Sequence, residues 1–213
     1  MKLYYSPTSP YVRKVVILIH ELGLQDQVAI QRVSIIGPVP GGGPDTPLVR
    51  SSNPLSKVPV LLLPDSTALF DSRVICEYLN SVANGGFFPP NGPKRWSALT
   101  LQALADGIMD ASVLVAIENR TTIRPAEKFH QPWVDTQKGK IIVALDSLES
   151  SVAKLGSADG ELTIGEVAVL CALEYLDLRV PDVEWRKGRE GLAAWAEAVG
   201  KRPAMVLSRP PSE

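Results

Sequence analysis

The chain has 213 residues, of which 45% are apolar and 21% are charged, and its formal net charge is −1. This length allows one large domain or two small ones with a substantial buried core. The balanced charge and the lack of a long basic stripe argue against a nucleic-acid partner. Apolar runs such as residues 15–19 fall far short of a membrane span, and the polar turn after Lys2 does not resemble a signal peptide. We therefore expect a cytoplasmic protein without a membrane partner.

The first elements form a strand–helix–strand unit. Residues 2–5 predict a strand, and Ser9 followed by Pro10 predicts a helix start, with serine at the N-cap and proline at N1. Gly23 ends the apolar helical pattern, and residues 28–33 predict a second strand. A crossover of this kind implies a parallel pair of strands.

The region rich in glycine and proline after residue 34 predicts a long loop. Residues 58–63 and 67–70 then predict an antiparallel hairpin. Residues 71–82 predict a helix that is capped by Asp71 or Ser72. The first segment is thus β-α-β, loop, β-β-α.

The rest of the chain has a helical pattern. Residues 84–93 predict a linker, in which we expect Phe87 and Phe88 to be exposed. Helices are predicted over residues 94–118, 132–155, 162–178 and 190–203. The predicted fold is an α/β domain over residues 1–83, the linker, and an all-α domain over residues 94–213.

Four local features bear on chemistry or stability. Ser9 is either a plain N-cap or a hydroxyl that holds a reactive group. Asp71 and Ser72 either cap a helix or bind the ammonium and carboxylate of an amino acid. Thr163 and Glu166 predict a capping box without a chemical role. The two cysteines, Cys76 and Cys171, are far apart in apolar patterns, which predicts buried thiols and neither a disulfide nor a metal site.

Taken in order, SPYVRK, NPLSKVPVL, FDSRVICEYL and LTIGEV resemble the glutathione S-transferase superfamily. More narrowly, the chain resembles small bacterial glutathione transferase-like proteins with the opening turn T-S-P-[FY]-V-R-K. The resemblance covers nearly the whole chain. It implies a thioredoxin-like first domain, a cis peptide bond before Pro59, and a homodimer with an electrophile pocket between the domains.

The resemblance also implies roles for individual residues, with glutathione as the co-substrate. The backbone of Val58 would pair with the cysteinyl part of glutathione. Asp71 and Ser72 would hold its γ-glutamyl amine and carboxylate, and Lys57 its glycyl carboxylate. Ser9 lies where serine-type classes keep the hydroxyl that stabilises the thiolate, and Tyr5 is the rival hydroxyl.

On the long helix, Asp106 and Asp110 are four residues apart. They either lie on a solvated face, or Asp106 approaches the γ-glutamyl amine bound by the other subunit. Three departures from the family pattern are Ser56 at a usual glycine, Glu166 where aspartate is commoner, and a loop in place of the second helix.

The main functional prediction is transfer of the glutathione thiolate to a small hydrophobic electrophile. The alternatives are a glutathione-dependent reductase or lyase, and a glutathione-binding protein-interaction module without significant turnover.

Overall fold

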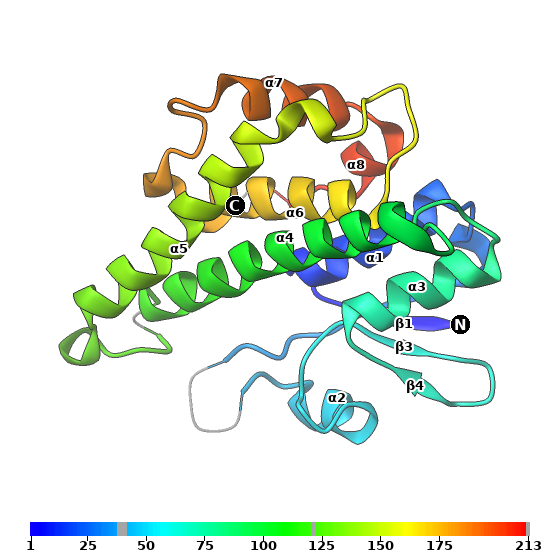
Figure 1. The fold of residues 1–213 in the computed structure, drawn as a ribbon. Coiled ribbons are helices and arrows are strands. Elements are labelled where there is room, and N and C mark those ends of the chain that lie inside the picture. Colours follow the sequence, from blue (N-terminus) through cyan, green and yellow to red (C-terminus); the bar gives the residue numbers. More distant parts are fainter. Residues whose placement is uncertain (38–41, 121, 212–213) are drawn as a thin grey trace. The chain divides into compact units, whose positions relative to one another are not determined.

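A computed structural model describes residues 1–37, 42–120 and 122–211, and the chain forms two compact units (Figure 1). The N-terminal unit comprises residues 1–85 together with the residues from Ala204 on, and the helical unit comprises residues 86–203. The division falls within the segment 84–93 that the sequence marks as a linker. The C-terminal residues, however, pack with the N-terminal unit, whereas the sequence placed them in the all-α domain.

The N-terminal unit is built on a small mixed sheet with strand order β2-β1-β3-β4. Strands β1 and β2 are parallel, whereas β1–β3 and β3–β4 are antiparallel, which confirms the predicted crossover and hairpin. The elements are β1 (Lys2–Tyr5), α1 (Pro10–Glu21), η1 (Gln25–Gln27), β2 (Ala29–Arg32), α2 (Thr46–Ser52), β3 (Val60–Leu62), β4 (Ala68–Leu69) and α3 (Ser72–Val82), with α8 (Pro203–Leu207) near the C-terminus. This is the thioredoxin-like arrangement that the sequence predicts.

Helix α1 begins and ends where the sequence predicts. Ser9 is its N-cap and Pro10 its first residue. At the other end Gly23 has φ +67°, its N–H donates to the His20 carbonyl, and the Leu24 N–H donates to the Ile19 carbonyl. This pair of hydrogen bonds is the Schellman motif, which needs a residue in the left-handed region and therefore favours glycine.

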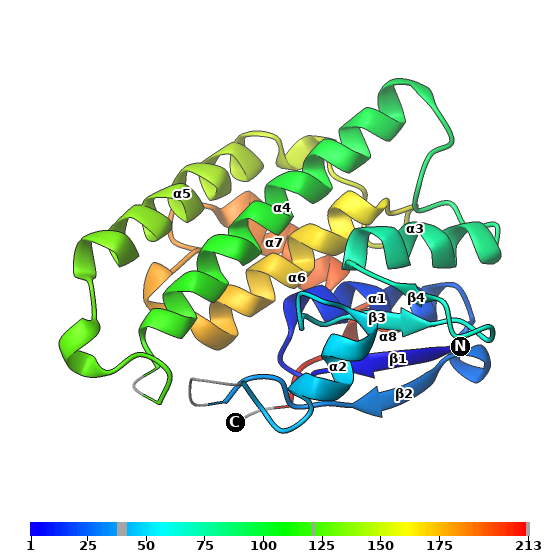
Figure 2. The same cartoon turned by 90° about the horizontal axis from the view of Figure 1, so that it is seen from below.

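Helix α2 corrects the prediction that a loop replaces the second helix. The Gly/Pro-rich loop lies before it, and residues 38–41 of that loop lie outside the described residues. Val49 of α2 is fully buried in a cluster with Tyr4, Val33 and Val60. Figures 1 and 2 show α2 on the face of the sheet opposite α1. Seven residues are too few for a helical period to be evident, and packing on the sheet stabilises the helix instead.

The C-terminal segment is attached to α1 through a buried arginine. Arg13 is 4% exposed, and its guanidinium donates to the Ser208 hydroxyl and the Met205 carbonyl, each at 3.4 Å. A cation that binds the last carbonyls of a helix satisfies acceptors that the helix itself leaves unpaired. This long-range contact explains why the end of the chain belongs to the N-terminal unit.

The helical unit is all-α, as the sequence predicts. It contains α4 (Gly92–Glu118), η2 (Ala126–Lys128), α5 (Gln131–Ser150), η3 (Val152–Lys154), α6 (Ile164–Arg179), η4 (Pro181–Val183) and α7 (Glu190–Val199). Helix α6 packs along α4 and is buried on nearly all sides. Helix α4 is long and apolar enough to cross a membrane by length and composition, contrary to our expectation, but half of its most apolar stretch is buried within the protein. That burial is typical of a core helix in a soluble protein.

The start of α6 has the predicted capping box. The Thr163 hydroxyl accepts from the Gly165 N–H at 3.2 Å, and the Glu166 carboxylate accepts from the Thr163 N–H at 2.8 Å. The Phe87 carbonyl accepts from the Ile164 N–H at 2.9 Å. Phe87 and Phe88 are only 8% and 7% exposed, so the expectation that they are exposed is wrong. The segment that we took for a linker is packed against the start of α6.

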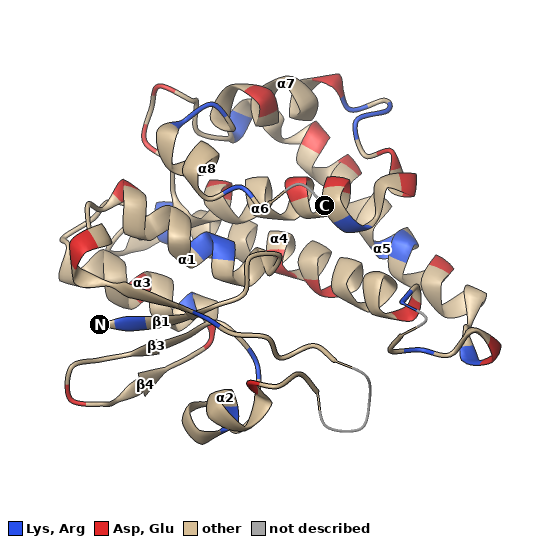
Figure 3. Ribbon diagram, turned by 180° about the vertical axis from the view of Figure 1, so that it is seen from behind, with Lys and Arg blue, Asp and Glu red and all other residues tan. Residues whose placement is uncertain are grey.

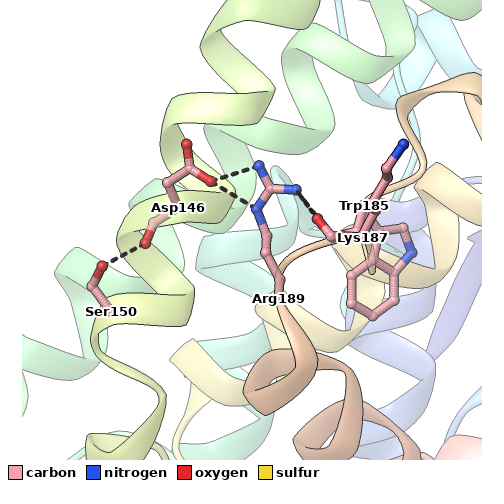
Figure 4. A network of polar contacts seen from close by, with 5 residues as sticks. All are labelled: Asp146, Ser150, Trp185, Lys187 and Arg189. Carbon is pink, nitrogen blue, oxygen red and sulfur yellow. Dashed lines mark hydrogen bonds and ion pairs between the residues drawn. The ribbon is translucent and has the colours of Figure 1, made fainter.

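Carboxylates of α5 hold the start of α7. Arg189, the N-cap of α7, donates to Asp146 of α5 through Nε at 2.9 Å and through Nη2, and a third nitrogen donates to the Lys187 carbonyl (Figure 4). Glu149 accepts from the N–H groups of Gly191 and Leu192 at 3.1 and 2.6 Å. The N-cap residue Arg189 makes no side-chain capping hydrogen bond, and Glu149 of α5 satisfies these amides instead.

Candidate functional site

Strand register brings the predicted site segments of the N-terminal unit to one end of the sheet. Tyr4 of β1 lies opposite Val60 of β3, so Pro59 lies level with the end of β1. Leu61 lies opposite Leu69 of β4, so the residues after β4 lie level with the start of β3. The turn before α1, the segment before β3 and the start of α3 therefore meet at the same end of the sheet (Figure 2).

Ser9 occupies the turn that joins β1 to α1. Its N–H donates to the Ser6 carbonyl at 3.1 Å, which closes the turn. Its hydroxyl oxygen accepts from the Val12 N–H at 3.3 Å, as an N-cap does. The hydroxyl is half-buried, and a capping oxygen uses only acceptor capacity. The O–H of Ser9 is thus able to donate to a ligand that lies beside the helix start.

The two tyrosines at the end of β1 have different environments. Tyr4 is 4% exposed and belongs to the core cluster under α2. Tyr5 points to the other face, because successive side chains of a strand alternate. Burial raises the pKa of the Tyr5 hydroxyl, and the positive charge of Arg32 lowers it by less. Tyr5 is therefore a neutral phenol at pH 7. It remains the alternative to Ser9 as the hydrogen-bond donor to a ligand.

The segment before β3 carries Lys57 and Val58. The Val58–Pro59 peptide bond is cis, which confirms the expectation from the family resemblance. Lys57 is exposed, and its carbonyl accepts from the side-chain amide of Asn53 at 2.9 Å. Ser56 has φ +54°, in the left-handed region that favours glycine. This conformation accounts for the glycine that the family pattern usually has at this position, from which Ser56 departs.

Helix α3 begins with the third pair of predicted residues. Asp71 is the N-cap, and one oxygen of its carboxylate accepts from the Arg73 N–H at 2.9 Å. Asp71 is exposed, so the rest of its acceptor capacity faces solvent. Ser72, the first residue of the helix, is 2% exposed. A carboxylate and a hydroxyl at a helix N-terminus have the chemistry to bind an ammonium and a carboxylate.

The two carboxylates of α4 have different environments. Asp106 is 2% exposed, whereas Asp110 is exposed. The solvated-face interpretation therefore fails for Asp106, whereas Asp110 is exposed in the single chain. Asp106 belongs to the helical unit, and its contact with a ligand of a partner subunit stays a prediction.

Two features of this end of the sheet escaped the sequence analysis. Asn53, treated there as part of a loop, is 2% exposed and hydrogen-bonded within the segment before β3. The Phe70–Asp71 peptide bond is cis although no proline follows. The Asn-Pro pair at 53–54 is a turn signal that could have drawn attention to Asn53, whereas no residue pattern indicates a cis bond before aspartate.

The described residues offer little for other kinds of site. Across residues 1–37, 42–120 and 122–211 there is no group of three or more His, Cys, Asp or Glu side chains arranged to hold a metal ion. Cys76 and Cys171 are both buried thiols, as predicted. In Figure 3 acidic and basic positions are interspersed along the helices.

Comparisons with known proteins support the same family at both ends of the chain. Residues 8–82 match the family model "Glutathione S-transferase, N-terminal domain", and residues 131–198 match "Glutathione S-transferase, C-terminal domain". The chain is 32% identical to an uncharacterized GST-like protein, YibF, of Escherichia coli K12, over 99% of both chains.

Solved structures give a similar result. A glutathione transferase family member from Pseudomonas fluorescens Pf-5, crystallised with bound glutathione, is 43% identical over 99% of each chain, with a TM-score of 0.90. A glutathione S-transferase from Methylobacillus flagellatus KT, also with glutathione bound, is 31% identical over 99% of each chain, with a TM-score of 0.83.

Proposed function

Because the chain belongs to the glutathione S-transferase family, we propose that it binds glutathione and activates its thiol for attack on a small hydrophobic electrophile. The observation that carries this proposal is the glutathione-bound structure of the Pseudomonas fluorescens relative, which matches the chain over 99% of its length. We place the chain with the small bacterial members whose opening turn resembles its TSPYVRK.

Glutathione is a tripeptide with one ammonium and two carboxylates, and the N-terminal unit offers a partner for each. Asp71 accepts from the γ-glutamyl ammonium, and the Ser72 hydroxyl, at the N-terminus of α3, donates to the γ-glutamyl carboxylate. The backbone of Val58 pairs with the cysteinyl residue. The exposed ammonium of Lys57 attracts the glycyl carboxylate. These assignments place the cysteinyl sulfur near the turn before α1.

Ser9 then donates a hydrogen bond to the sulfur. A free thiol has a pKa of about 8.5, so only about 3% is ionised at pH 7. A hydrogen bond to a charged group contributes about 1.5–3 kcal/mol, and the N-terminus of α1 adds about 0.3–1 kcal/mol. Lowering the thiol pKa by two units requires about 2.7 kcal/mol. The two effects together are sufficient, and Ser9 does not itself act as the nucleophile.

We propose that the protein is a cytoplasmic homodimer whose contact includes one face of α4. Exposed residues recur on this helix at alternating spacings of four and three, so they form one continuous face, and Trp96, Leu114 and Ile117 among them are large and apolar. They are Trp96, Thr100, Ala103, Gly107, Asp110, Leu114 and Ile117. Leu114→Asp should then convert the dimer to a monomer in light scattering, whereas a wild-type monomer at micromolar concentration would contradict the proposal. The Asp106 role in the partner's site depends on this dimer.

Retention on immobilised glutathione followed by turnover of a generic aryl halide tests the function. The proposal predicts both retention and glutathione-dependent turnover. Retention without activity across a panel of electrophiles would instead support the binding module. Activity only toward disulfides or in elimination reactions would support the reductase or lyase.

A further inference from the structure

Asn53 is a buried residue whose side chain is used entirely within one short segment. It follows the last residue of α2 and is 2% exposed. Its side-chain nitrogen donates to the Lys57 carbonyl at 2.9 Å, and its side-chain oxygen accepts from the Leu55 N–H at 3.0 Å. Its backbone carbonyl accepts from the Ser56 N–H at 2.8 Å. One residue therefore fixes the three that follow Pro54.

The Lys57 carbonyl belongs to the peptide group that also contains the Val58 N–H. In a planar trans peptide the C=O and the N–H point in opposite directions. Because the Asn53 amide holds the Lys57 carbonyl, it also fixes the Val58 N–H on the side of the peptide away from Asn53. The direction of a backbone donor at the proposed cysteinyl subsite is thus set by a side chain that need not touch the ligand.

A second side-chain hydrogen bond also holds this segment, and it is more exposed than those of Asn53. The Arg50 guanidinium donates to the Ser56 hydroxyl at 3.0 Å, and this hydrogen bond is exposed. Ser56 adopts φ +54°, which a non-glycine residue visits only at a cost. An exposed hydrogen bond competes with water and contributes little, whereas the hydrogen bonds of Asn53 are partly buried and come from a side chain that is almost fully buried. The Asn53 side chain, rather than Arg50, should therefore determine the backbone geometry of residues 55–58.

We propose that Asn53 is a positioning residue for glutathione: it orders residues 55–58 so that the Val58 backbone is ready to pair with the cysteinyl part. This inference rests on the proposed function. In the absence of the Asn53 amide, binding would have to order the segment, and affinity falls by the cost of that ordering.

Calorimetric titration with glutathione tests the proposal in Asn53→Ala and Asn53→Asp. Asn53→Asp keeps the size and the acceptor for the Leu55 N–H but lacks the donor to the Lys57 carbonyl. We expect both variants to raise the Kd for glutathione about tenfold or more, since Asn53→Asp loses one partly buried hydrogen bond and Asn53→Ala loses two. In steady-state kinetics the KM for glutathione should rise while kcat at saturating glutathione stays unchanged. This is because the variants weaken binding of glutathione equally in the ground state and in the transition state.

Two control variants separate positioning from general destabilisation. Arg50→Ala removes the exposed hydrogen bond to the Ser56 hydroxyl and should change the Kd for glutathione less than threefold. Thr163→Ala removes the N-cap of α6 in the helical unit and should lower stability while leaving the Kd unchanged.

Wild-type affinity in both Asn53 variants would overturn the positioning role, as would an equal loss of affinity in Thr163→Ala. A wild-type protein that does not bind glutathione at all would overturn the proposed function, and this inference with it.

Discussion

Replacing Ser9 tests two roles of one hydroxyl, and the structure offers a way to separate them. Ser9→Ala removes the oxygen that accepts from the Val12 N–H at 3.3 Å, which should lower the free energy of unfolding by about 1 kcal/mol, as for a lost N-cap. It also removes the O–H that we propose donates to the glutathione sulfur. A lost charge-assisted hydrogen bond of about 1.5–3 kcal/mol should raise the pKa of the bound thiol by about one to two units, toward about 8.5.

Ser9→Asp distinguishes the two effects. Aspartate is as good an N-cap as serine, so stability should stay within about 0.5 kcal/mol of wild type. It cannot donate when ionised and places a negative charge near the sulfur, so the thiol pKa should rise at least as far as in Ser9→Ala. Ser9→Thr keeps both the acceptor and the donor and should resemble wild type.

The assay is the ultraviolet absorbance of the bound thiolate against pH, with urea denaturation of each variant alongside. The reasoning is refuted if the thiol titration is the same in wild type, Ser9→Ala and Ser9→Asp. Ser9 would then be a helix cap only, and Tyr5 would become the leading candidate for the donor.

Further variants test glutathione recognition and the fold. Ser72→Ala should raise the Kd for glutathione about 10- to 150-fold by calorimetry, since a hydrogen bond to a charged group is lost; an unchanged Kd would remove Ser72 from the site. Glu149→Ala leaves two N–H groups of α7 without their acceptor and should lower the free energy of unfolding by about 0.5–2 kcal/mol, whereas Glu149→Gln should lose less; equal stability of all three proteins would contradict this. Gly23→Ala, at φ +67°, should destabilise by about 1–2 kcal/mol. Gly139→Ala, in open space within α5, should instead stabilise by about 0.5–1 kcal/mol, so the two glycine variants must move the denaturation midpoint in opposite directions.

Elements with local signals were predicted well from the sequence. Ser9–Pro10 and Gly23 marked both ends of α1, because capping and the left-handed turn depend on residues adjacent in the chain. Thr163 and Glu166 marked the start of α6 for the same reason.

Features that depend on distant contacts were missed. Helix α2 is stabilised by packing of Val49 on the sheet, and its seven residues show no period of their own. The attachment of the C-terminal segment depends on Arg13, which lies 195 residues from Ser208 in the sequence. The burial of Asp106 is likewise set by tertiary packing, because its charge and spacing alone resemble a solvated face.

The roles of the site residues stay predictions. Helix-start patterns singled out Ser9, Asp71 and Ser72, the family resemblance added Val58, and register brings their segments to one end of the sheet. Asn53 was missed because its role appears only when its side chain is seen to bind the Lys57 carbonyl.

Proton release on glutathione binding is the most direct test of thiol activation. If the thiol pKa falls from about 8.5 to about 6.5 on binding, the ionised fraction at pH 7 rises from about 3% to about 76%, and binding releases about 0.7 proton. Calorimetry in buffers of different ionisation enthalpy measures this number together with the affinity. The account predicts binding with release of most of one proton at pH 7. Binding without proton release would contradict thiol activation, and the absence of binding would contradict the proposed function.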